Sequence, residues 1–157
     1  MHVKCYWFSI SVVLCYNISE RIYRKGEQSG VKQKLLLIDG NSILNRAFYG
    51  LPDMTNSQGL HTNAILGFLN IMFKFLEEEN PTHLAVAFDL KAPTFRHKMF
   101  ADYKGTRKGM PDELQEQVPV IREVLKAMNI PLMMEEGYEA DDLLGTCLLY
   151  TSPSPRD

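Results

Sequence analysis

Five acidic side chains stand at or just beyond the ends of apolar runs: Asp39, Asp89, Glu139, Asp141 and Asp142. Brought together, that many carboxylates repel one another, and some would have to take up protons. Bound divalent cations remove the repulsion, and hard oxygen ligands with room for several waters suit Mg²⁺ or Mn²⁺. The first question is therefore whether the fold gathers these residues.

The elements that would position them are strands alternating with helices. Apolar runs predict three strands, at residues 34–38, 82–88 and 130–134. Helical patterns accompany them at residues 42–49, 62–79 and 111–128, with another helix opening at 137–142. Pro119 is expected to kink the helix in which it lies. This order predicts an α/β fold with a parallel central sheet and flanking helices.

A parallel sheet gives the acidic residues a common location. Right-handed crossovers place the carboxyl ends of all strands along one edge, where such folds bind ligands. Each residue also has an ordinary explanation, because an Asp after a strand, such as Asp39 or Asp89, is a common turn residue or helix N-cap. The pair Asp141 and Asp142 would likewise complement a helix dipole. Three such coincidences on one predicted edge favour a cation site.

A basic segment follows the second acidic position. Residues 96–108 (RHKMFADYKGTRK) carry five Lys or Arg and one acid, whereas residues 31–146 as a whole carry 12 basic and 16 acidic residues. We expect this segment to cross above the acidic edge as a mobile loop or short helices. Tyr103, Lys104 and Arg107 offer an aromatic face and two cations, which suits single-stranded nucleic acid. A solvated run of charge is the alternative.

Together, the two features are the setting of phosphodiester hydrolysis with two metal ions. Cations would hold the phosphate, one metal ion would generate hydroxide, and both would stabilise the charge of an in-line displacement. The histidines His61, His83 and His97 show no ligand spacing and are interpreted as surface or packing residues, with a phosphate contact left open for His97.

Three segments carry a resemblance to a known family: KLLLIDGNS with the following RAFYGLP, then AFDLKAPTFRHKMFADYKGTR, then GYEADDLLGT. In this order they resemble the 5′ nuclease domains of the flap endonuclease family, of the kind that begins bacterial DNA polymerase I. The resemblance covers residues 34–146. It implies a PIN-like 5′ nuclease fold and a 5′-3′ exonuclease or flap endonuclease of the bacterial cytoplasm, acting on DNA in replication and repair.

The resemblance also implies roles for individual residues. Two Mg²⁺ or Mn²⁺ ions would be held, directly or through water, by Asp39, Asp89, Glu139, Asp141 and Asp142. Lys104 and Arg107 would act as catalytic groups on the scissile phosphate, Tyr103 would stack on a displaced base, and Arg96 would contact the backbone. Asn41 and Ser42 are expected to shape the turn that aims Asp39. The family's later carboxylates and helix-hairpin-helix element do not follow here, so we expect a sheet incomplete at its C-terminus and an inactive chain.

The two ends of the chain differ from the middle. Residues 31–146 contain neither Cys nor Trp, which excludes a disulfide framework or a cysteine zinc site there. The apolar run at residues 6–16 is too short to cross a bilayer as a helix. Our hypothesis is that residues 1–30 are upstream DNA translated in frame, with a leader or anchor as the alternative. Residues 147–157 resemble a translated sequencing adapter, with a natural Ser/Pro-rich tail as the alternative.

Composition limits the remaining interpretations. A length of 157 residues and a net charge of −2 suit one globular domain and exclude a bulk polycation. We expect a monomer without an obligate protein partner or membrane association, and poor solubility from an exposed strand edge and apolar helix faces. Three alternatives stay open: a PIN-like ribonuclease, which would lack the basic segment, a non-catalytic nucleic-acid-binding module, and a membrane-anchored or secreted protein.

Overall fold

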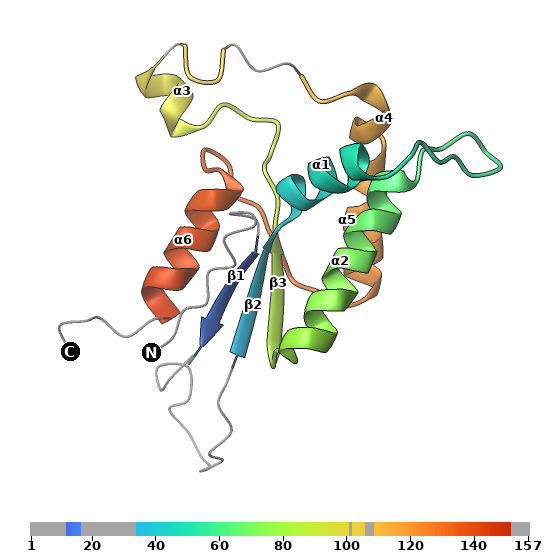
Figure 1. Ribbon diagram of the computed structural model, residues 1–157. Helices are drawn as coiled ribbons and strands as arrows, with labels where there is room; N and C mark the ends of the chain where they lie inside the picture. The colour runs from blue at the N-terminus through green and yellow to red at the C-terminus, as the bar shows by residue number, and fades with distance from the viewer. Residues whose placement is uncertain (1–11, 17–33, 101, 106–108, 152–157) are drawn as a thin grey trace.

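The three expected strands pair in parallel at the centre of the molecule (Figure 1). The computed structural model describes residues 12–16, 34–100, 102–105 and 109–151. β2 (Lys34–Asp39) pairs with β3 (His83–Ala87), and β3 pairs with β4 (Leu132–Met133). The predicted strands are therefore confirmed, with the third reduced to two residues.

A further strand, β1 (Val12–Tyr16), lies outside the predicted pattern. It pairs antiparallel with β2, so that Val12 lies opposite Ile38 and Tyr16 opposite Lys34. Since β3 uses one side of the β2 backbone, β1 bonds to the side that an edge strand would leave unpaired. The sheet therefore has the order β1-β2-β3-β4 and adds one antiparallel strand to a parallel core.

Helices cover both faces of the sheet (Figure 1). On one face lie α1 (Gly40–Gly50), α2 (Asn63–Glu79) and α5 (Gln117–Ala127), and on the other lies α6 (Ala140–Thr151). Alternate β2 side chains enter the two layers: Leu36 and Ile38 join the larger core, and Leu37 joins the core beneath α6. Burial on both faces explains why this strand is apolar at each position from Leu35 to Ile38, and the predicted α/β class is confirmed.

The helix expected over residues 111–128 is divided into two. α4 (Asp112–Gln115) ends and α5 begins at Gln117, with Glu116 between them. Pro119 has no N–H to donate to the carbonyl of Gln115, and its ring crowds that carbonyl. The irregularity predicted from Pro119 therefore appears about one turn before the proline.

The start of α2 is capped by a residue from another helix. No side-chain cap comes from its own N-cap residue, Thr62. Instead, the buried Gln117 accepts hydrogen bonds through Oε1 from the N–H groups of Ala64 (2.9 Å) and Ile65 (3.2 Å), and its Nε2 donates to Asn63 Oδ1 at 3.0 Å. These N–H groups have no partner within α2. Gln117 therefore joins α5 to the start of α2.

Between β3 and α4 the chain leaves the sheet and passes over its carboxyl-terminal edge (Figure 1). A short helix in this passage, α3 (Phe95–Met99), lies near the start of α6, where the N–H of Phe95 donates to the carbonyl of Gly137 at 2.9 Å. The structure thus bears out the expected crossing for the described part of the basic segment. Among the described helices, none has the length and apolar character needed to cross a membrane.

Candidate active site

Asp39 is both the last residue of β2 and the N-cap of α1. Its Oδ1 accepts the N–H of Ser42 at 3.0 Å, and its Oδ2 accepts the Ser42 hydroxyl at 2.6 Å. Burial raises the pKa of this carboxyl, and the nearby charge of Asp89 raises it further. The ordinary N-cap explanation is therefore correct for Asp39, yet the residue also lies within electrostatic reach of a second acid.

Gly40 allows α1 to begin close to the end of β3. A Cβ atom at this position would lie 2.4 Å from Cε1 of the buried Phe88 ring, closer than real Cβ contacts come. The helix can start here only because residue 40 has no side chain. The Asp39-Gly40 pair thus combines a helix cap with a close approach between two elements.

Asp89 connects three elements at the same edge. Its Oδ1 accepts the N–H of Ala140 at the start of α6 at 2.7 Å, and its Oδ2 accepts Asn41 Nδ2 from α1 at 2.9 Å. Its main-chain carbonyl accepts Arg122 Nη2 from α5 at 3.0 Å. The residue that follows the second predicted strand therefore lies where α1, α5 and α6 meet.

Asp141, in the first turn of α6, completes an electrostatic group. Burial raises its pKa most, and the charges of Asp39, Asp89 and Glu139 raise it further, in that order. Lys104 acts in the opposite direction. Asp141 thus feels the charge of Asp39 and Asp89, which come from two other segments, and of its neighbour Glu139. We refer to the sheet edge that carries these four acids and Asp142 as the carboxylate edge.

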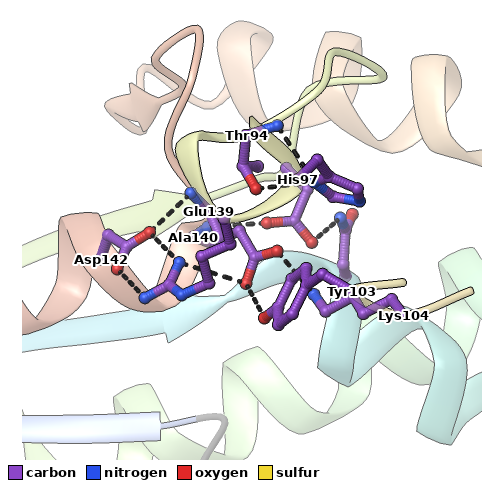
Figure 2. Close-up of polar contacts among 10 residues, drawn as sticks. Thr94, His97, Tyr103, Lys104, Glu139, Ala140 and Asp142 are labelled. Atoms are coloured by element: carbon purple, nitrogen blue, oxygen red, sulfur yellow. Dashed lines mark hydrogen bonds and ion pairs between the residues drawn. The ribbon is translucent and has the colours of Figure 1, made fainter. Parts of the chain in front are cut away.

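Glu139 is held by residues of the basic segment (Figure 2). Lys104 Nζ lies 2.7 Å from Glu139 Oε1, and the Tyr103 hydroxyl donates to Oε2 at 3.2 Å. Figure 2 shows both side chains reaching toward Glu139 from the same short stretch of chain. Lys104 has a positive φ of 59°, so the chain turns sharply where this cation is presented. A cation of the basic segment thus contacts the carboxylate edge directly.

Asp142 is paired in the same way. Arg96 binds it through two parallel hydrogen bonds, Nη1 to Oδ2 at 2.7 Å and Nη2 to Oδ1 at 2.6 Å. This bidentate pairing holds the pKa of Asp142 below its ordinary value. Asp142 Oδ2 also accepts the N–H of Glu139 at 3.0 Å, which serves the start of α6. In the described structure, Arg96 and Lys104 therefore act as counter-ions of the acids, and a wholly solvated charge run does not describe them.

The donor set fits a hard divalent cation, although no cluster of ligands is assembled. Nowhere in the described ranges do three acidic, His or Cys side chains converge closely enough to hold a metal ion. The acids with raised pKa values, Asp39 and Asp141, nevertheless supply hard oxygens whose repulsion a cation would relieve. Asn41 Oδ1, beside Asp89, is a buried oxygen without a hydrogen-bond partner. Which of the five acids ligate a metal remains a prediction.

The other predicted residues divide into two groups. Arg107 lies outside the described residues. His97 caps α3, since its Nδ1 accepts the N–H of Thr94 at 3.2 Å and lies 2.8 Å from the Thr94 hydroxyl. His61 joins the loop before α2 to the residue between α4 and α5, with Nδ1 2.7 Å from Glu116 Oε1, and His83 lies beside the Thr82 hydroxyl. The structural interpretation of the three histidines agrees with these contacts.

One cation near the site, Arg122, was not predicted from the sequence. Arg122, in α5, donates to Asp89 and lies over the Phe88 ring, 4.9 Å from guanidinium carbon to ring centroid. Burial lowers its pKa. The available signal was a basic residue directly after Ile121, within the apolar stripe of a helix. That signal does not say which strand end the side chain reaches.

Comparison with known proteins agrees with the resemblance. The sequence profile described as "5′-3′ exonuclease, N-terminal resolvase-like domain" matches residues 34–153. DNA polymerase I of Geobacillus stearothermophilus is 54% identical over 116 residues, and that of Bacillus subtilis 53% over 115 residues. A 5′-3′ exonuclease of Aquifex aeolicus is 47% identical over 110 residues. These matches cover 70 to 74% of this chain, but only 13% of the two polymerases and 38% of the exonuclease.

Proposed function

Because the chain belongs to the 5′-3′ exonuclease family through its N-terminal resolvase-like domain, we propose that it supplies the first part of a nuclease that hydrolyses DNA phosphodiester bonds at 5′ ends and 5′ flaps. The parent protein would be a DNA polymerase I that acts in replication and repair in the bacterial cytoplasm. The polymerase relatives support this proposal. Residues 31–146 would be the nuclease part, acting as a monomer.

The observation that carries the proposal is the charge arrangement at the carboxylate edge. Asp39, Asp89 and Asp141 come from three segments and feel one another's charge, and cations of the basic segment reach the acids beside them. A phosphodiester is an anion that needs cations around it and a nucleophile beside it. The carboxylate oxygens of the edge would bind the metal ions, and the Lys and Arg side chains beside them would bind the phosphate.

Two Mg²⁺ or Mn²⁺ ions, when bound, would supply an activated water and stabilise the charge that develops on the phosphate. Asp39, Asp89 and Asp141 are the first candidates to hold them, since repulsion among these acids is what a cation relieves. Glu139 and Asp142 would join once their pairing with the basic segment is exchanged. Asn41 orients Asp89 through its hydrogen bond.

The basic segment would hold the DNA strand. Arg96 and Lys104 contact carboxylates here, and a bound phosphate would compete for the same donors. Together with Arg107 they would bind the scissile phosphate and its neighbours. Tyr103, whose ring lies 5.2 Å from that of His97, would stack on a displaced base.

The decisive experiment replaces Asp89 with Asn in the gene product extended to the full nuclease domain. With a 5′-flap DNA and MgCl₂, cleavage should fall by about 100-fold or more while DNA binding survives, since one charge of the acidic group is lost. The matched control is Glu78→Gln, which neutralises an exposed acid of α2 paired with Lys74 and should change neither property.

Three results would contradict the proposal. Cleavage unaffected by Asp89→Asn would remove the acidic edge from the chemistry. Faster cleavage of an RNA strand of the same sequence would favour the PIN-like ribonuclease. DNA binding with no cleavage by the unmodified domain would favour a non-catalytic binding module.

A further inference from the structure

A pocket of about 770 Å³ opens beside Asp89, and its lining residues differ from those of the basic segment's ion pairs. Its walls come from the start of α1, the residues that follow β3, and the α4-α5 region. Asp89 belongs both to this pocket and to the carboxylate edge, and Asn41, which also lines the pocket, donates a hydrogen bond to Asp89. The pocket therefore adjoins the candidate active site and shares two side chains with it.

Two residues that line this pocket each carry a buried polar atom without a hydrogen-bond partner. In the part of the chain that the structure describes, two buried side-chain atoms lack a hydrogen-bond partner, and they are Asn41 Oδ1 and Arg122 Nε. Such atoms are uncommon in folded proteins and call for a physical reason. One is an acceptor and the other a donor, and both residues line the same cavity. Because both atoms are buried, a ligand that donates and accepts hydrogen bonds would reach them only after these two side chains move.

The rest of the lining combines apolar and cationic groups. Leu90, Met110 and Val118 supply apolar surface, while Lys91 and Arg122 supply positive charge. A volume of this size is typical of small-molecule sites, which are mostly apolar with a few placed polar groups. An apolar wall suits the face of a nucleobase, and two cations suit a phosphate. Apart from Asp89, which the pocket shares with the carboxylate edge, this lining suits a nucleotide.

We propose that this pocket binds one nucleotide of the DNA strand next to the scissile phosphate, with the base against Met110 and Val118 and the phosphate held by Lys91 and Arg122. The proposal rests on the proposed function, because the neighbouring acids make this strand the relevant ligand. Arg122 is then a binding residue, joined to Asp89 through its hydrogen bond to the main-chain carbonyl. The nucleotide would reach the site between the sheet edge and the chain that passes over it.

The test is equilibrium dialysis of labelled dAMP against the 157-residue chain with MgCl₂, which needs no cleavage. Arg122→Met removes the cation, and Val118→Trp fills the pocket with an indole. Each should weaken dAMP binding by about tenfold or more, which corresponds to about 1.4 kcal/mol. Lys126→Met, four residues further along α5 at an exposed ion pair with Glu123, is the matched control and should leave binding within about twofold.

Further arms separate this proposal from failure of the proposed function. Circular dichroism would reveal whether Val118→Trp prevents folding. Lys91→Met changes an exposed residue, so it should leave the fold intact and still weaken dAMP binding. Asp141→Asn, outside the pocket, should leave dAMP binding nearly unchanged. If dAMP binds in this way while the full domain fails to cut DNA, the pocket stands and the nuclease proposal falls.

Several results would overturn the inference. Absence of dAMP binding at millimolar concentration would do so, as would binding that Arg122→Met and Lys91→Met leave intact. Inorganic phosphate that binds as tightly as dAMP would show that no base is recognised. Binding lost in Asp141→Asn but retained in a folded Val118→Trp would place the nucleotide on the carboxylate edge.

Discussion

The two flanks of Asp89 hold their cations in different ways. On the α6 flank, Arg96 and Lys104 are paired with the carboxylates of Asp142 and Glu139. On the α5 flank, Arg122 donates to a main-chain carbonyl and lies over an aromatic ring. The cations of the first flank form ion pairs with acids of the chain, whereas Arg122 forms no ion pair among the described residues and is acted on by the charge of Asp89 from a longer distance.

This difference affects how each flank can bind a ligand. A phosphate or a metal ion that binds on the α6 flank has to replace an existing ion pair. Its binding free energy is therefore the difference between the new interaction and the ion pair that is lost. An anion that binds on the α5 flank meets a cation that has no ion pair to exchange among the described residues, with Asp89 as the nearby negative charge. We therefore expect binding on the α6 flank to reorganise side chains and binding on the α5 flank to add contacts.

The largest expected effect concerns the acids between the flanks. Asp141→Asn in the full nuclease domain should lower cleavage of a 5′-flap DNA by about 100-fold, or about 2.7 kcal/mol in the barrier. The free energy of unfolding should not decrease, because the substitution removes repulsion with Asp39 and Asp89. Flap cleavage and urea unfolding measured on one preparation check both parts. Loss of stability together with activity would show that Asp141 is structural.

A smaller effect tests whether the hydrogen bonds of Gln117 stabilise the α5 flank. Gln117→Leu should lower the free energy of unfolding by about 2 kcal/mol, because it leaves the buried N–H groups of Ala64 and Ile65 without an acceptor. Urea denaturation measures the change. Gln115→Leu, at an exposed position two residues earlier, is the control and should stay within about 0.5 kcal/mol of the unmodified chain. Equal losses would mean that the Gln117 hydrogen bonds are not what stabilises this flank.

The same replacement on each flank compares them directly. Arg96→Met should lower the urea midpoint, because it leaves Asp142 without its bidentate partner, and sodium chloride near 1 M should reduce that difference by screening. Arg122→Met should change stability by less than about 1 kcal/mol and respond less to salt than Arg96→Met, since the lost hydrogen bond is offset by easier burial and Arg122 has no ion pair among the described residues. An equal response to salt in the two variants would erase the distinction between the flanks.

The smallest effect is in the pH dependence of stability. The pKa of Asp142 is lowered, so its contribution is complete above the ordinary value of 3.8 and is lost as pH falls through the lower folded value. The pKa values of Asp39 and Asp141 are raised, so their ionisation penalty is relieved as pH falls through the folded values toward 3.8. Urea unfolding should therefore show a slight gain on mild acidification, then a decline below 3.8. A steady decline from neutral pH would contradict the raised values.

Local patterns in the sequence predicted the strands and the acids that end them. The end of α2 was also predictable, because Asn followed by Pro is typical of a helix end. Asn80 adopts the left-handed φ of 42° there, directly before Pro81. The contacts of Arg122 and Gln117 were not readable, because their partners lie 33 and 53 residues away along the chain. Pairing of β1 with β2 was likewise missed, since an isolated apolar run does not specify its neighbour. Periodicity encodes the elements, whereas packing decides which side chains meet.

The Phe88 ring lies between Gly40 at the start of α1 and Arg122 in α5, and it contacts both. A methyl group at residue 40 would push the ring aside, and that ring is the surface on which the Arg122 guanidinium rests. A change at the first turn of α1 would therefore travel through one aromatic side chain to the far wall of the neighbouring pocket. The absence of a side chain at Gly40 is therefore a condition for the position of the Arg122 guanidinium.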